Sequence, residues 1–242
     1  MTQHTRKIFT FSGADRVDFL QGLVTNDVTR SGLVYAALLT PQGKYIADFF
    51  LLRRENDILL DVSATLADAL AQRLTMYKLR ADVSIAASDL AVSCGLGDTP
   101  EGAFADPRNP ALGWRCYGEG SEDIPDMTAL RVAHCVPETG IELTLDTYIL
   151  EAGFERLNGV DFKKGCYVGQ EVTARMKHKT ELRKGLATVS MNGSAEIGTP
   201  ITSEGKAVGT LYSQAEGRAI AYLRFDRATG QMEADGATIT YP

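Results

Sequence analysis

Few residues in this sequence are suited to hold a metal or to build a disulfide framework. It has four cysteines and three histidines, with no Cys-x-x-Cys pair and no His-Glu-x-x-His run. Zinc sites and disulfide-rich domains need such residues at close, regular spacings, so neither class is predicted. We expect the thiols to be reduced, as is usual inside cells. The cysteines are Cys94, Cys116, Cys135 and Cys166.

Positive charge in excess and long apolar runs are also missing. The chain of 242 residues has 31 acidic and 25 basic side chains, a net charge of −6, whereas dedicated nucleic-acid binders usually have a basic excess. Its most apolar stretch, near Phe49–Leu52, is far too short to span a bilayer. Residues 1–6 are polar and do not resemble a signal peptide. We therefore expect a soluble, cytoplasmic protein that contacts neither nucleic acid nor membrane directly.

Nucleotide-binding signatures are absent too. There is no G-x-G-x-x-G or Walker A run, and strands do not alternate regularly with helices, which disfavours a Rossmann-type parallel sheet. Instead, the pattern predicts strands at 34–39, 45–53 and 58–62. The turn residues Thr40-Pro41-Gln42-Gly43 join the first two, as in an antiparallel meander. Apolar spacing also predicts helices from Leu66 to about Arg80 and from Asp146 to Leu157.

The composition changes near Glu181. From there to the end, short apolar–polar alternations are separated by glycine-containing turns, which is typical of a small barrel or sandwich. The sequence therefore predicts an α+β protein with two parts. Residues 1–180 form the larger part, with antiparallel sheets and helices, and residues 181–242 form a C-terminal β-domain.

One run of residues predicts a chemical site. Lys163-Lys164-Gly165-Cys166-Tyr167-Val168-Gly169-Gln170-Glu171 places a thiol beside two lysines, two glycines, an amide and a carboxylate. Positive charge near a thiol favours the reactive thiolate, and Lys164 is a candidate to supply it. Glycine permits backbone conformations and close approaches that a side chain would block. The alternative is a buried structural thiol, since free cysteine is often buried.

This run resembles the signature of the YgfZ-type folate-binding proteins, which are related to the aminomethyltransferase, or T-protein, of the glycine cleavage system. Further segments agree in order over essentially the whole chain. They are Phe19–Val28, Pro41–Lys44, Met76–Ala81 and Asp106–Arg108.

The resemblance implies an aminomethyltransferase-like fold of α+β subdomains closed by a small C-terminal β-barrel, with tetrahydrofolate or a one-carbon derivative bound in a central opening. It implies folate-dependent assembly or repair of iron–sulfur clusters, including those of [4Fe–4S] enzymes that modify tRNA. The implied partners are folate, iron–sulfur assembly proteins and [4Fe–4S] client enzymes. The cysteine, here Cys166, is the residue most closely tied to that role.

Two mechanisms for Cys166 follow. Its thiolate is a suitable ligand for iron, so it is a candidate for transient contact with a cluster, although one cysteine cannot hold a cluster alone. Alternatively, it acts as a redox or one-carbon-accepting nucleophile beside folate. We favour the first mechanism.

Candidate folate contacts lie in several segments. A carboxylate can accept the adjacent N–H and amino groups of a pterin, which favours Asn26 and Asp27, although both residues are equally typical of a turn. Arg80 and Arg108 suit the anionic glutamyl tail. Arg80 is also explained by the end of a helix, and Arg108 by neutralisation by Asp106.

The motif supplies the remaining candidates. Tyr167, Gln170 and Glu171 are predicted folate contacts, and the last two are alternatively residues that hold the cysteine loop in place. A basic run follows, for which a solvated surface is the simpler interpretation. It consists of Arg175, Lys177, His178 and Lys179.

Two other functions remain open from the sequence. The first is a folate-dependent aminomethyl transferase, whose family depends on an aspartate near the start of a helix. Asp61 and Asp68 both lie in the corresponding neighbourhood. The second is an interaction scaffold with a vestigial folate pocket. The cysteine motif favours an assembly factor over a conventional turnover enzyme.

Overall fold

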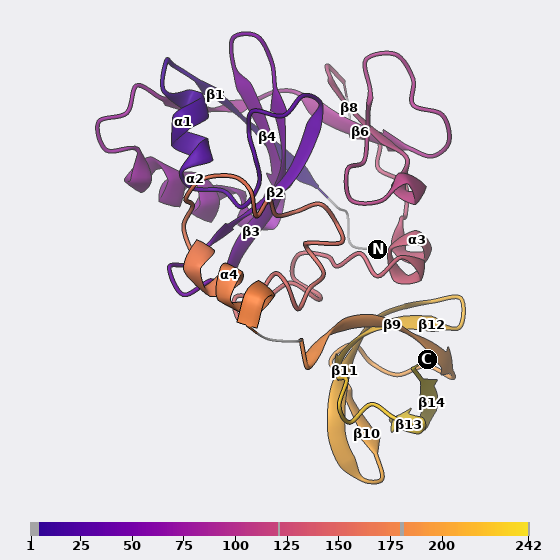
Figure 1. The fold of residues 1–242 in the computed structure, drawn as a ribbon. Helices are drawn as coiled ribbons and strands as arrows, with labels where there is room; N and C mark the ends of the chain where they lie inside the picture. The colour runs from indigo at the N-terminus through magenta and orange to yellow at the C-terminus, as the bar shows by residue number, and fades with distance from the viewer. Residues whose placement is uncertain (1–4, 121, 180–181, 242) are drawn as a thin grey trace. The chain divides into compact units, whose positions relative to one another are not determined.

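The computed structural model describes residues 5–120, 122–179 and 182–241, which form two compact units (Figure 1). The first unit is built from residues up to 125 and from 155–172. The second is built from 126–154 and from 173 onward. The predicted boundary between residues 180 and 181 lies outside the described residues and stays a prediction.

A five-stranded antiparallel sheet forms the centre of the first unit, in the order β2-β3-β4-β1-β5. Its strands are β1 (Arg6–Ser12), β2 (Leu33–Leu39), β3 (Tyr45–Arg53), β4 (Ile58–Ser63) and β5 (Ser84–Ser88). The predicted meander of three strands is confirmed by β2, β3 and β4, which pair consecutively. The two helices of this part are α1 (Arg16–Gln21) and α2 (Ala64–Lys78).

One face of this sheet carries the apolar core. Successive side chains of a strand point to opposite faces, and one set, including Phe49 and Leu60, packs with Leu70 and Leu74 of α2. Every residue of β2 is buried, so both faces of the sheet are covered. A strand buried on both faces reads as a continuous apolar run rather than an alternation, as it does here.

The other face carries buried charges stacked around Phe50. The guanidinium carbons of Arg6, Arg108 and Arg115 lie 5.7, 4.8 and 4.0 Å from the centroid of its ring. Asp61 accepts hydrogen bonds from Arg6 at 2.6 Å and Arg115 at 3.2 Å. Arg115 comes from β8 of a second, three-stranded sheet, so these ion pairs join the two sheets. That sheet consists of β6 (Ala91–Gly95), β7 (Phe104–Ala105) and β8 (Trp114–Gly118), and the 3-10 turn η1 (Pro110–Leu112) precedes β8.

The second unit contains a closed six-stranded barrel, which confirms the predicted C-terminal β-barrel (Figure 1). Its interior is apolar, with side chains such as Val189, Leu211 and Leu223 fully buried. Helix α3 (Thr128–Ala133) packs on the outer face, where Val132 contacts Ile220. The strands are β9 (Lys184–Asn192), β10 (Pro200–Ser203), β11 (Lys206–Ala215), β12 (Arg218–Arg224), β13 (Gln231–Ala234) and β14 (Ala237–Thr240).

The predicted helix over 146–157 is wrong, because this segment forms turns. A single helical turn ends at Gly153, whose φ is +79°. There the amide of Phe154 donates to the carbonyl of Ile149, and that of Gly153 donates to Leu150, the pattern of a Schellman helix end. Conversely, the basic run after residue 174 belongs to a helix the sequence did not predict, α4 (Gln170–Lys179).

Replacing Asp61 with asparagine should destabilise the protein far more than the same change at Asp68. Asp61 is 1% exposed and paired with two arginines, whereas the Asp68 side chain is 93% exposed. Removing one partner of a buried pair costs about 3–5 kcal/mol, and a surface pair contributes about 0–1 kcal/mol. Urea unfolding of both variants is the measurement. Equal midpoints for Asp61→Asn and Asp68→Asn would contradict the role of the buried network.

Candidate functional site

Hydrogen bonds in the first unit join two segments that lie far apart in the sequence, residues 21–30 and 158–164. We call this contact the seam. The hydroxyl of Thr25 donates to the carbonyl of Gly159 at 2.7 Å, and the amide of Asp161 donates to the carbonyl of Thr25 at 3.0 Å. At one end of the seam, Arg30 pairs with the Asp161 carboxylate at 2.7 Å. The seam fixes the chain just before the cysteine motif.

Lys164 closes the seam. Its Nζ donates to the carbonyls of Gln21, Val24 and Asn26 at 2.9, 2.6 and 3.0 Å. Since an ammonium has three donors, all of its hydrogens are engaged by the main chain. The same Nζ lies 5.4 Å from the centre of the Tyr167 ring. Lys164 therefore acts as a clamp on the loop.

Burial lowers the pKa of Lys164 to about 8, while the nearby carboxylates of Asp27 and Asp161 act in the opposite direction. Lys164 was predicted to be catalytic, and in the structure its hydrogen bonds position the cysteine loop. Its neighbour Lys163 is exposed, and only the Lys163 amide, which donates to Asp161, is held.

Gly169 holds the other end of the cysteine loop against the turn that contains Pro41 and Gln42. Its φ is +83°, and a Cβ there would lie 2.7 Å from the carbonyl oxygen of Thr40. Gly43 approaches from the other side, where a Cβ would lie 2.9 Å from Cβ of Val172. Both positions need glycine because the two backbones approach so closely. The Pro41–Lys44 and cysteine segments, noticed separately in the sequence, therefore meet in the fold.

Cys166 lies between these two anchors and is exposed, with a free thiol. The position before it, Gly165, is open: an added Cβ would meet no atom within 4 Å. The buried-thiol alternative is thus excluded for this residue, whereas Cys94 and Cys135 are buried. The thiol is reachable from solvent, as both proposed mechanisms require.

Asn26 and Asp27 have the bonds of a structural turn. The Asn26 amide donates to the carbonyls of Tyr35 and Asn158, and its oxygen accepts from the amide of Asp27. One oxygen of Asp27 accepts from Gln21 and from both the amide and hydroxyl of Thr29. The bonds from Thr29 lower the pKa of Asp27. Their predicted contact with folate stays a prediction, for which the second oxygen of Asp27 is the available group.

The other predicted contacts are dispersed. Arg108 forms a bidentate pair with Asp106 at 3.0 and 2.7 Å, as the neutralisation alternative predicted. Burial opposes the ionisation of Asp106, yet Arg108 and Arg115 outweigh it and lower its pKa. Arg80 is exposed just beyond the end of α2, away from any ion pair that the structure describes.

The residues after Cys166 begin helix α4. Tyr167 is buried against Lys164, Gln170 is half-buried, and Glu171 is exposed in the first turn. A carboxylate in that position is favourable to the helix dipole. Within 5–120, 122–179 and 182–241, no group of three or more His, Cys, Asp or Glu side chains is arranged to hold a metal.

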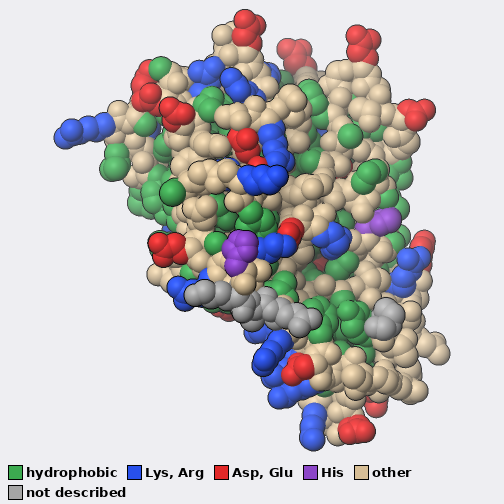
Figure 2. Space-filling view, viewed as in Figure 1, with side chains coloured by type: hydrophobic (Ala, Val, Ile, Leu, Met, Phe, Trp, Pro, Cys, Tyr) green, Lys and Arg blue, Asp and Glu red, His purple; other side chains and the backbone are tan. Residues whose placement is uncertain are grey.

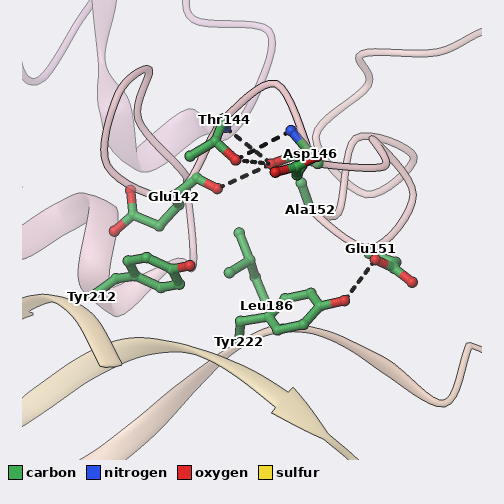
Figure 3. Close-up of a pocket in the computed structure, with 9 residues that line it drawn as sticks. Glu142, Thr144, Asp146, Glu151, Ala152, Leu186, Tyr212 and Tyr222 are labelled. Atoms are coloured by element: carbon green, nitrogen blue, oxygen red, sulfur yellow. Dashed lines mark hydrogen bonds between the residues drawn. The ribbon is translucent and has the colours of Figure 1, made fainter. Parts of the chain in front are cut away.

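A pocket that the sequence did not reveal lies in the second unit, on the outside of the barrel (Figure 3). It has a volume of about 200 Å³. Leu186 of β9, Tyr212 of β11 and Tyr222 of β12 form one wall, and the turns of residues 142–152 form the other. The remaining lining residues are Glu142, Thr144, Asp146, Thr147, Glu151 and Ala152.

Two carboxylates of this pocket differ in their surroundings. Glu142 is fully used, since it accepts from the amides of Ser213 and Glu138 and lies 3.6 Å from Arg131. Glu151 accepts one hydrogen bond from the Tyr222 hydroxyl at 2.7 Å, which Figure 3 draws as a dashed line. Burial, together with that bond, raises the pKa of Tyr222. Tyr222 therefore stays a donor and orients the Glu151 carboxylate.

No helix in the described part of the chain is both long and apolar enough to cross a bilayer.

The order of the sheets, the seam and the barrel define an aminomethyltransferase-like fold. The chain is similar to a crystal structure of the glycine cleavage system aminomethyltransferase T from Bartonella henselae, with a TM-score of 0.78. That similarity covers 98% of this chain and 83% of the other at 14% sequence identity, so it shows the fold. The predicted fold class is confirmed.

Comparisons of the sequence give a family model and several curated relatives. A family model, the CAF17 C-terminal beta-barrel domain, matches residues 183–241. The homologues include iron-sulfur cluster assembly factors named IBA57. The mitochondrial IBA57 homolog of Mycosarcoma maydis is 31% identical over 224 residues, covering 76% of this chain and 55% of that protein. The human mitochondrial IBA57 is 28% identical, with 97% and 80% covered. This chain thus spans about half the length of the fungal relatives.

Lys164→Gln should loosen the cysteine loop, and Lys163→Gln should not. Lys164 satisfies three carbonyls, whereas the Lys163 side chain is exposed. Hydrogen bonds from a charged group contribute about 1.5–3 kcal/mol, so we expect a loss of stability on the order of 2–3 kcal/mol. Urea unfolding and amide hydrogen exchange over residues 158–169 measure both effects. Unchanged exchange in Lys164→Gln would show that the ammonium does not hold the loop.

Proposed function

We propose that this protein is a tetrahydrofolate-binding factor of the YgfZ type that acts in the assembly or repair of iron–sulfur clusters, with Cys166 as its functional thiol. The observation that carries the folate proposal is the pocket, which has the oriented carboxylate of Glu151 and a wall that contains two tyrosines. The cluster proposal is supported by the printed names of the IBA57 relatives and by the exposed thiol on a clamped loop.

The chemistry of the pocket suits a pterin ring. A pterin presents an N–H and an amino group side by side, and one carboxylate can accept both. Glu151 keeps that capacity because the bond from Tyr222 uses one of the four acceptor positions of its carboxylate. Tyr212 and Tyr222 supply aromatic surface for a flat ring. We therefore propose Glu151 for the ring in preference to Asn26, whose side-chain amide serves the seam, and Asp27, whose carboxylate stabilises its own turn.

The size of the pocket also supports a ring rather than an entire folate. Sites that enclose a whole drug-sized ligand are roughly 300–1,000 Å³, and this pocket has about 200 Å³. A bicyclic ring would fill it, and the aminobenzoyl-glutamate portion would extend outside.

Cys166 would act on a cluster rather than on folate itself. A thiolate is a soft ligand that suits iron–sulfur clusters. Because one thiol is insufficient, the remaining ligands would come from the partner, an assembly protein or a [4Fe–4S] client enzyme. The cluster is cargo in this proposal, and Lys164 and Gly169 keep the thiol presented to the partner.

An aminomethyl transferase is the second candidate, favoured by the fold. Of the two candidates for its aspartate, Asp61 is fully engaged by Arg6, Arg115 and Tyr117, and Asp68 is exposed on α2. Formation of methylene-tetrahydrofolate from an aminomethyl donor would favour this second function.

We propose the cytoplasm as the compartment, in keeping with the absence of a disulfide framework.

Glu151→Gln should weaken tetrahydrofolate binding, and Glu196→Gln should not. The side-chain amide of glutamine has one acceptor oxygen and no charge. It therefore cannot accept both pterin donors as the Glu151 carboxylate can. A hydrogen bond to a charged group contributes about 1.5–3 kcal/mol, which predicts a loss of about 10- to 100-fold in affinity. Glu196 is an exposed control on the same unit. Calorimetric titration is the measurement, and wild-type protein that binds no tetrahydrofolate would refute the folate proposal.

Cys166→Ser should fold normally yet fail to restore the activity of [4Fe–4S] enzymes in cells that lack this protein. Serine keeps the size of the side chain and removes the soft ligand. Cys116→Ser is the matched control, since Cys116 is half-exposed and bonds weakly to the carbonyl of Gly102 at 3.8 Å. Full complementation by Cys166→Ser would mean that the thiol has no role.

A further inference from the structure

The wall of the pocket continues beyond it as a row of side chains on the outer face of the barrel. β9 and β12 pair in antiparallel register, with Tyr222 opposite Leu186 and Arg224 opposite Lys184. Residues two apart on a strand point to the same face. Because Tyr222 and Leu186 line the pocket, Arg224 and Lys184 extend the same surface by one step, about 7 Å along the strands.

The exposure of the side chains in this row increases from one end to the other. Its first pair, Ile220 and Thr188, is covered by α3: Ile220 packs on Val132, and the Thr188 hydroxyl donates to the Val132 carbonyl. The second pair lies in the pocket. The third, Lys184 and Arg224, is about half exposed at 51% and 47%. A ligand seated in the pocket therefore has one open direction along this row, toward the two cations.

The positive charges of Lys184 and Arg224 are only partly neutralised by acidic neighbours. Like charges directly opposite each other on neighbouring strands are destabilising. Lys184 lies 4.0 Å from Glu151, and Arg224 lies 3.8 Å from Asp226, which also lies 3.9 Å from Arg227. These contacts are long, and one acidic side chain serves two arginines. In Figure 2, blue side chains lie beside red ones in the lower part of the view.

Lys184 also links the pair to the pocket. Its Nζ lies 5.7 Å from the centre of the Tyr222 ring, so a ligand that covers this ring would come within reach of the ammonium. Arg224 is one step to the side and has no described contact with a pocket-lining residue. An anion placed between them would relieve the repulsion of the two cations and would neutralise part of their charge.

We infer that Lys184 and Arg224 form an anion subsite that binds the carboxylate tail of the ligand whose ring occupies the pocket. This inference rests on the proposed function, because it takes the ring to be the pterin of tetrahydrofolate. The tail is then its γ-glutamyl chain, and tetrahydrofolate with additional γ-glutamyl units should bind more tightly than the form with one.

The experiment compares three ligands by calorimetric titration at low and high salt. They are 6-methyltetrahydropterin, which has no tail, tetrahydrofolate with one glutamate, and tetrahydrofolate with five. In wild-type protein, affinity should rise in that order, and the rise should shrink at high salt because exposed charges are screened. Two exposed ion pairs contribute up to about 1 kcal/mol each, so we expect the tail to raise the affinity by up to about 30-fold.

The variants separate the tail from the ring. Arg224→Gln should lower the affinity for both folates several-fold and leave that for 6-methyltetrahydropterin unchanged, and Lys184→Gln/Arg224→Gln should remove most of the tail's contribution. The control, Lys206→Gln/Arg218→Gln, removes two exposed cations from the same barrel and should match wild type.

The folate function and the anion subsite can be refuted separately. If the wild-type protein binds none of the three ligands, the proposed folate function is wrong. If it binds the pterin and both folates equally, or if Arg224→Gln and the control variant weaken folate alike, the ring site stands and the anion subsite is wrong.

Discussion

The site in the first unit depends on one long-range contact, the seam between residues 21–30 and 158–164. More than 130 residues separate its two sides, yet Thr25, Asn26 and Lys164 join them through main-chain carbonyls. Carbonyl acceptors are well suited to this task, since each buried C=O must find a donor in any case. The ammonium of Lys164 satisfies three of them at once and makes the start of the cysteine loop rigid.

This arrangement separates the structural from the chemical part of the cysteine motif. Lys164 faces inward and clamps, Tyr167 is buried, and Gly169 permits the close packing of the loop on the turn of Thr40. Cys166 is exposed to solvent with a free thiol. Much of the motif thus holds the backbone in place, and the positive charge of Lys164 is committed to carbonyls.

The sequence predicted the meander, the helix after Leu66 and a C-terminal β-domain because these depend on local periodicity and on turn residues, and the family resemblance implied that this domain is a barrel. It did not predict the end of the turn at Gly153, where one glycine with positive φ overrides an apolar spacing that otherwise fits a helix. The roles of Asn26 and Arg108 were open for a similar reason. Their residue types suit both a ligand and a structural bond, and only their partners, Asn158 and Asp106, decide between them.

The pocket was invisible in the sequence for a geometric reason. Its walls come from turns around Glu151 and from three barrel strands, so its residues share no local spacing and no motif. What unites them is the register of β9 and β12, which sets Tyr222 beside Leu186 and Arg224 beside Lys184. A shift of one residue in this pairing would turn both tyrosine and arginine toward the barrel interior. The apolar side chains of Ala221 and Leu223, fully buried inside the barrel, exclude that shift. The barrel core therefore determines which side chains a ligand meets on the outside.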